Sequence, residues 1–163
     1  MTEQKTDASE TIAASAFPWP PVLFIALIAA AVFATRFWPL PWPGIDDAPA
    51  HWVGLSFGAA GVVLIVWAVA TLRKHGTTFM PDRTASVLVT TGPFMRFRNP
   101  IYLGDALLIL GIAEITKSIW FVAAAFAFGV LVTVLQIVPE ERRLESKFGD
   151  AYIDYKSRTR RWI

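Results

Sequence analysis

Residues 92–104 read Gly-Pro-Phe-Met-Arg-Phe-Arg-Asn-Pro-Ile-Tyr-Leu-Gly, a basic, aromatic loop that runs directly into an apolar helix. Asn99 suits the N-cap, and Pro100 suits the first helical position because proline lacks the N–H that would have no partner there. The helix is therefore expected to begin at the boundary between water and lipid. Arg96 and Arg98 flank its positive N-terminal end, an arrangement that favours an anionic group.

A second polar cluster, Glu140-Glu141-Arg142-Arg143, follows the last apolar run. Two apolar runs, residues 101–115 and 119–138, separate the clusters, and the polar break between the runs favours a helical hairpin. The first run is short for a full span, whereas the second can cross a core of ~30 Å at ~1.5 Å per residue. A hairpin would bring both clusters to one membrane face, which makes their meeting point the candidate site.

The composition favours an integral membrane protein. Of the 163 residues, 55% are hydrophobic and 17% charged, and the mean hydropathy is +0.48. The length predicts one domain. Because the chain has no Cys, disulfides, thiolate metal sites and a cysteine nucleophile are excluded. The two His residues lie far apart and predict no metal site. The net charge of +2 gives no reason to expect a nucleic-acid partner.

Upstream of the loop, the sequence predicts a mobile tail over residues 1–19 and two transmembrane helices within residues 20–72, separated by a proline-dense connector. The second helix carries Gly54 and Gly58, a spacing that lets helices approach closely within one chain or in a homo-oligomer. Residues 73–99 contain five Lys and Arg against one acid. The positive-inside rule therefore places them, and both termini, in the cytoplasm, as expected for a bacterial inner-membrane protein.

Downstream of Glu140 the pattern is amphipathic. An apolar helical face is formed by Leu144, Phe148, Ala151, Tyr152 and Tyr155, interrupted by Gly149. Such a helix lies on the bilayer or folds back over the connector. The fold expected is thus an all-α membrane bundle of about four transmembrane helices with a C-terminal amphipathic helix, in which residues 73–163 form the functional core.

These motifs resemble the isoprenylcysteine carboxyl methyltransferase family, and phospholipid methyltransferases share much of the pattern. The resemblance rests on Gly92-Pro93-Phe94, residues 98–104, Glu140-Glu141 with Leu144, Phe148-Gly149, Tyr152 and Tyr155. It implies a multi-span enzyme that holds S-adenosylmethionine (SAM) on the cytosolic side and takes a lipophilic acceptor from the bilayer. It assigns to the cofactor site Arg98, Asn99, Pro100, Tyr102, Gly104, Glu140 and Glu141. Many members have His where this chain has Asn99.

The residue chemistry agrees with that assignment. A guanidinium such as Arg98 suits the SAM carboxylate, since it can bind both oxygens, and a Glu suits the ammonium or the ribose. Aromatic faces suit the adenine and the sulfonium, for which the candidates are Tyr102, Phe148, Tyr152 and Tyr155. We expect Arg98 and Glu141 to be catalytic. A carboxylate acceptor needs no base, whereas an amine or thiol must lose a proton, which a Glu can take.

Each residue also has a structural interpretation. Arg96 and Arg98 can be positive-inside anchors, Glu140 and Glu141 a solvated helix start, and the tyrosines interface packing. These interpretations together describe a non-catalytic lipid-binding protein or assembly factor. Since Glu140 and Glu141 point about 100° apart on a helix, at most one of them is expected to face a common pocket.

Overall fold

The computed structural model describes residues 19–76 and 87–163, and this part of the chain is all helical. Its elements are α1 (Trp19–Phe37), α2 (Ala48–Lys74), the 3-10 helix η1 (Gly92–Met95), α3 (Pro100–Thr116), α4 (Ile119–Val132), the π-helical turn η2 (Thr133–Ile137), α5 (Val138–Phe148) and α6 (Asp150–Arg158). The predicted all-α class is confirmed. The predicted tail, except Trp19, and residues 77–86 of the connector lie outside the described residues.

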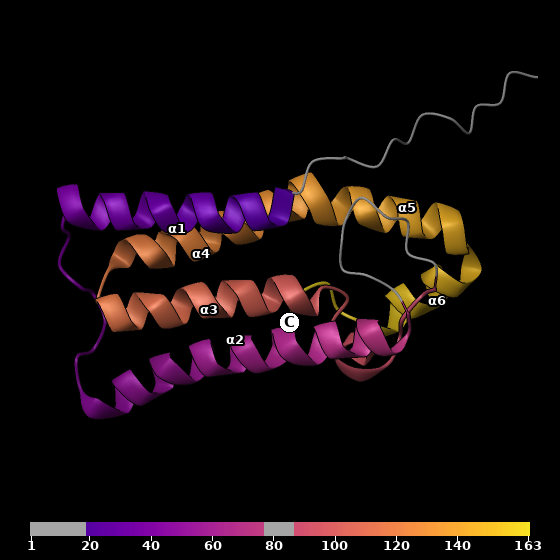
Figure 1. Ribbon diagram of the computed structural model, residues 1–163, viewed down its shortest axis with the longest axis horizontal. Coiled ribbons are helices and arrows are strands. Elements are labelled where there is room, and N and C mark those ends of the chain that lie inside the picture. The colour runs from indigo at the N-terminus through magenta and orange to yellow at the C-terminus, as the bar shows by residue number, and fades with distance from the viewer. Residues whose placement is uncertain (1–18, 77–86) are drawn as a thin grey trace, which may run out of the picture.

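The four long helices run antiparallel in the order α1, α4, α3, α2 across the bundle (Figure 1). The connections α1–α2 and α3–α4 lie at one end, which we call the outer end. At the other end, the inner end, η1 leads into α3, and α5 extends α4 beyond the bundle before α6 folds back. The loop before α3 and the segment after α4 therefore share the inner end, as the hairpin predicts.

The chain has the helices of an integral membrane protein. Three stretches are long and apolar enough to span a bilayer: Pro20–Phe37, Ala48–Lys74 and the continuous helix Ile119–Phe148. With 17 residues, α3 is shorter, as its apolar run indicates. Large apolar side chains face outward, as lipid contact requires; examples are Ile25, Phe33, Trp52, Val63, Val66, Phe126 and Val130.

Glycines let α2 and α3 pack backbone to backbone. A Cβ on Gly111 would lie 2.5 Å from the Cα of Gly58, and a Cβ on Gly61 would lie 2.6 Å from the carbonyl oxygen of Gly104. Any side chain at these positions would push the helices apart. The small-residue spacing noted in the second helix thus serves packing within the chain.

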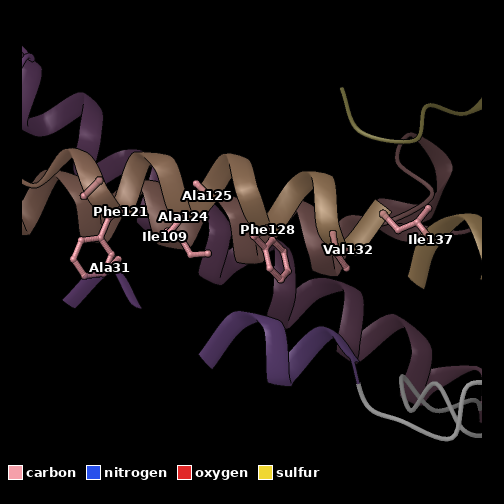
Figure 2. Close-up of a cluster of buried hydrophobic side chains, with 9 residues drawn as sticks. Ala31, Ile109, Phe121, Ala124, Ala125, Phe128, Val132 and Ile137 are labelled. Atoms are coloured by element: carbon pink, nitrogen blue, oxygen red, sulfur yellow. The ribbon is translucent and has the colours of Figure 1, made fainter. Parts of the chain in front are cut away.

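The apolar core joins α1, α3 and α4 and continues through η2 (Figure 2). Phe128 and Val132 on α4, and Ile137 on η2, are fully buried. Near the end of the apolar run 119–138, the helix widens by one π turn, in which the N–H of Val138 bonds to the carbonyl of Thr133. The wide turn accommodates Pro139, whose ring and missing N–H disturb an ordinary α-helix.

The segment after η2 bends sharply at Gly149. This residue has φ of 53°, a conformation that favours glycine, and it divides the predicted amphipathic stretch into α5 and α6. Tyr152 and Tyr155 are buried, whereas Ala151, which the predicted apolar face also includes, is exposed because the bend turns α6 relative to α5. The stretch therefore folds back over the connector.

Candidate functional site

Arg98 connects the loop before α3 to Glu141 and to the chain after α6. Its Nε donates to Oε1 of Glu141 at 3.1 Å, and its Nη1 donates to the carbonyl oxygens of Thr159 at 2.6 Å and Lys156 at 3.1 Å. The Arg98 side chain is 10% exposed. The two polar motifs therefore meet directly, and these three bonds leave part of the five-donor guanidinium for another acceptor.

Glu141 is buried between two guanidinium groups. Besides Arg98, it accepts from Arg161, whose Nε lies 3.1 Å from Oε1 and whose Nη2 lies 2.6 Å from Oε2. The hydrogen bond to this carboxylate raises the pKa of Arg161 above its usual value. Such charge-assisted, two-oxygen contacts are among the stronger and more directional polar interactions in proteins.

Residues 159–163, which we call the strap, cross the inner end. A parallel bridge joins Phe97 to Arg160, with the Arg98 N–H donating to the Arg160 carbonyl at 2.8 Å and the Arg160 N–H to the Arg96 carbonyl at 3.0 Å. Trp162 Nε1 lies 3.2 Å from Oγ1 of Thr133 on η2. The strap thus ties the loop before α3 to the π turn.

Asn99 holds the strap instead of capping α3 with its side chain. Its Nδ2 donates to the carbonyl of Arg161 at 3.2 Å, and its side chain makes no capping hydrogen bond. Asn99 thus occupies the N-cap position of α3 as predicted, but its side chain is turned toward the strap and makes no capping hydrogen bond. Pro100 occupies the first turn of α3 as predicted and is fully buried.

Glu140 faces a different group of side chains from Glu141. It accepts a long hydrogen bond of 3.5 Å from Nε2 of Gln136, and it belongs to a polar group that also includes Tyr102, Asp105 and Arg143. The angular separation of neighbouring helical residues thus produces two adjoining polar groups, one around each glutamate.

The two tyrosines of α6 are both buried but differ in their partners. The Tyr155 hydroxyl donates to the carbonyl of Phe94 at 2.8 Å, and burial raises its pKa to about 12. Tyr152 is 0% exposed, and burial raises its pKa as well. Both hydroxyls are therefore protonated at neutral pH, but Tyr152 has no hydrogen-bond partner for its oxygen among the described residues.

Unpaired buried polar atoms concentrate at this end. Three such side-chain atoms occur in the described part of the chain, and two of them, the Tyr152 hydroxyl and Oε1 of Gln136, belong to the groups around the glutamates. The third, Nε1 of Trp42, lies in the outer connector. Because more than nine in ten buried polar groups are normally paired, these two unpaired atoms, one in the polar group around each glutamate, are unusual.

The remaining predicted residues have other surroundings. Gly104 faces α2, and Phe148 is half-buried beneath the ammonium of Lys147, 5.7 Å from its ring centroid. Residues that the sequence analysis missed are Thr133, Gln136, Arg161 and Trp162. Gln136 had a signal, since an amide inside a long apolar run is unusual. The strap gave no such signal, because basic residues beside a Trp are also typical of a segment that lies at a membrane surface.

Comparison with known proteins identifies the family. Residues 49–151 match the family model described as phospholipid methyltransferase. The chain belongs to the phospholipid methyltransferase family. This confirms the predicted resemblance and extends it to α2, which the motifs left out. The matched region includes Arg98, Gln136 and both glutamates, and ends just before Tyr152 and the strap.

Two relatives are metal-resistance proteins. The chain is 28% identical over 142 residues to the nickel-cobalt-cadmium resistance protein NccN of Alcaligenes xylosoxydans xylosoxydans, covering 86% of this chain and 60% of NccN. It is 34% identical over 120 residues to the cobalt-zinc-cadmium resistance protein CzcN of Cupriavidus metallidurans, covering 72% and 51%. An uncharacterized protein of Haemophilus influenzae is 41% identical over 51 residues, covering 28% and 81%. The chain thus spans only 60% and 51% of the lengths of the two resistance proteins.

Proposed function

We propose that the protein is a membrane methyltransferase that uses SAM to methylate a lipophilic acceptor at the inner end of the bundle. The inner end corresponds to the cytoplasmic face, where the positive-inside rule places the connector. One observation carries the proposal: in a chain of this family, the two polar motifs meet at a buried junction that retains unpaired polar atoms.

The residues at the junction suit SAM. The free N–H groups of Arg98 suit its carboxylate, and the carboxylates of Glu140 and Glu141 suit its ammonium or ribose. The unpaired Tyr152 hydroxyl would hydrogen-bond to it, and the Tyr102 ring would provide an aromatic face. SAM supplies an activated methyl group on a sulfonium. The strap would shield this site from water and so help to hold the reactants in contact geometry.

The two glutamates would divide the work. Because Glu141 is held between Arg98 and Arg161, we assign it to positioning the loop and the strap. Glu140 bonds only weakly to Gln136, so its carboxylate is the better proton acceptor for an amine or thiol acceptor group. This assignment separates positioning from proton transfer.

The test follows the tritiated methyl group of SAM into organic-extractable lipid, with the protein in liposomes. Wild type is expected to label lipid, and Glu140→Gln to turn over about 100-fold more slowly, the low end for loss of a general base. Glu145→Gln is the control, because Glu145 pairs with Lys156 on the exposed side of α5. Unlabelled lipid with folded wild type contradicts the function, and equal rates for the two variants contradict the role of Glu140.

A second function has one observation in its favour. Arg98 and Glu141 bind each other, so both motifs also stabilise the fold. A non-catalytic lipid-binding protein or assembly factor would use them in this way alone, and it predicts that folded protein binds no SAM. The metals named in the two resistance proteins enter no step proposed for this chain.

A further inference from the structure

Gln136 combines deep burial with an unused acceptor. Its side chain is 1% exposed, and Oε1 has no hydrogen-bond partner among the described residues. The amide presents its NH₂ to Glu140, with Nε2 donating to Oε2 at 3.5 Å. Its carbonyl oxygen is thereby left unpaired. Leaving a buried acceptor unpaired costs roughly 1–3 kcal/mol, which an apolar residue of similar size would avoid.

The backbone at Gln136 is also unusual. The residue lies in the π turn η2, which inserts one wide turn between two regular helices. Single π turns occur frequently at functional sites. The strap contacts the same turn, since Trp162 donates to Thr133. The orphaned oxygen therefore lies on an irregular turn that borders the proposed site, not within an ordinary lipid-facing helix.

The charges around Gln136 select the kind of ligand group. Glu140 bonds to its amide, and Glu140, Asp105 and Arg143 all act on the nearby Tyr102 hydroxyl. The group therefore contains two carboxyl groups and one guanidinium. An unpaired carbonyl beside the Glu140 carboxyl group suits an N–H donor such as an ammonium, which can bond to the carbonyl and to a carboxyl oxygen together.

We propose that Gln136 is a ligand-binding residue whose Oε1 accepts a hydrogen bond from an ammonium group, with Glu140 as the charge partner. The inference rests on the proposed function and specifies one contact between the protein and a reactant of that methyl transfer. The ammonium has two sources in that reaction, the amino-acid part of SAM and an amine headgroup of a membrane acceptor. Gln136 acts by binding and does not itself move a proton.

The experiment compares Gln136→Met, which keeps an unbranched side chain without a hydrogen-bonding amide, with Val134→Leu, a lipid-facing change on the same turn. Each protein, purified in detergent, is titrated calorimetrically with S-adenosylhomocysteine and with dihexanoyl-phosphatidylethanolamine, with the phosphatidylglycerol analogue as headgroup control. Gln136→Met is expected to bind either S-adenosylhomocysteine or the phosphatidylethanolamine with about tenfold lower affinity, as loss of a hydrogen bond to a charged group predicts. Val134→Leu should leave both unchanged.

The ligand whose affinity falls in Gln136→Met identifies the source of the ammonium. Thermal unfolding without ligand provides a second readout: Gln136→Met removes an unpaired carbonyl oxygen and, with it, only the long 3.5 Å hydrogen bond to Glu140, so it is expected to be about as stable as wild type. A clear loss of stability, or unchanged affinity for both ligands, overturns the proposal. If wild type binds no S-adenosylhomocysteine, the proposed function fails, and the inference is then decided by the phosphatidylethanolamine titration alone; binding of neither ligand overturns both.

Discussion

The two ends of the bundle each bury a glutamate, but they use it differently. Glu114 at the outer end and Glu141 at the inner end are equally buried, and each contacts two basic side chains. Glu114 binds Lys117, one turn away, and His51 of α2 at 3.1 Å, while Lys117 also binds Asp46 at 3.0 Å. This group fastens the outer connector to the ends of α2 and α3.

Glu141 instead joins segments that are distant in sequence, and the inner end also contains a π turn and two unpaired buried polar atoms, Tyr152 Oη and Gln136 Oε1. A buried ion pair alone therefore does not mark a functional site, because both ends have one. The unpaired hydroxyl, the unpaired amide oxygen and the irregular helix distinguish the inner end. They are features that stability does not require.

The largest expected effect is at Glu141. Glu141→Ala leaves the nearly buried Arg98 without its anion, which is expected to cost about 3 kcal/mol of unfolding free energy. Glu114→Ala should lower the melting temperature less, because the His51 and Lys117 side chains are 45% and 30% exposed and water can replace their partner. Thermal unfolding monitored by tryptophan fluorescence in detergent measures both. Equal losses of stability in Glu141→Ala and Glu114→Ala would contradict the stronger structural role given to the inner ion network.

A packing change near the outer end is expected to affect stability alone. Gly111→Ala places a Cβ against the backbone of Gly58 and should cost about 1–3 kcal/mol through overpacking. Gly129→Ala is the control, since nothing lies within 4 Å of the added Cβ, and it should be neutral or slightly stabilising. If Gly111→Ala unfolds at the same temperature as Gly129→Ala, α2 and α3 do not pack as described.

The paired tyrosine of the inner end has a smaller structural role. Tyr155→Phe removes the hydrogen bond to the Phe94 carbonyl and should lower the unfolding free energy by about 1 kcal/mol. Tyr152→Phe removes a hydroxyl without a partner and should leave stability unchanged or raise it. Denaturation of the two variants side by side separates them. A loss for Tyr152→Phe as large as that for Tyr155→Phe would show that its hydroxyl is structural.

Among the changes that weaken a contact, the smallest loss of stability is expected at the strap. Arg161→Lys keeps the charge but cannot bind both oxygens of Glu141, and because Arg161 is 38% exposed the cost should stay below about 1 kcal/mol. Hydrogen exchange followed by mass spectrometry should nevertheless show faster exchange of the Arg98 and Arg160 amides, which form the bridge. Unchanged exchange there would mean that Arg161 does not hold the strap.

Much of the fold follows from local sequence. The apolar runs predict the helices, the proline-dense connector separates the first two, and Pro100 begins α3 because the first turn needs no N–H from it. Gly149 marks a break whose geometry the sequence leaves open. The spacing of Gly54 and Gly58 predicts close packing but does not identify the partner, which is α3.

The site was harder to predict because its decisive contacts join residues far apart in the chain. Motifs identified Arg98, Glu140 and Glu141, but not that Glu141 is held by two arginines while Glu140 faces Gln136. The Asn99 side chain hydrogen-bonds to a strap carbonyl and not to the backbone at the start of α3, and this partner depends on tertiary structure. Likewise, the π turn before Pro139 arises where the chain must continue as a helix despite a proline.

The most direct test of the account is calorimetric titration of detergent-purified wild type, Tyr152→Phe and Tyr155→Phe with S-adenosylhomocysteine. The account predicts binding by wild type, affinity about 3- to 10-fold weaker in Tyr152→Phe through loss of one neutral hydrogen bond, and nearly wild-type affinity in Tyr155→Phe. Folded wild-type protein that binds no S-adenosylhomocysteine, or a Tyr152→Phe variant that binds it as tightly as wild type, would contradict the claim that the inner end is a cofactor site containing the unpaired hydroxyl.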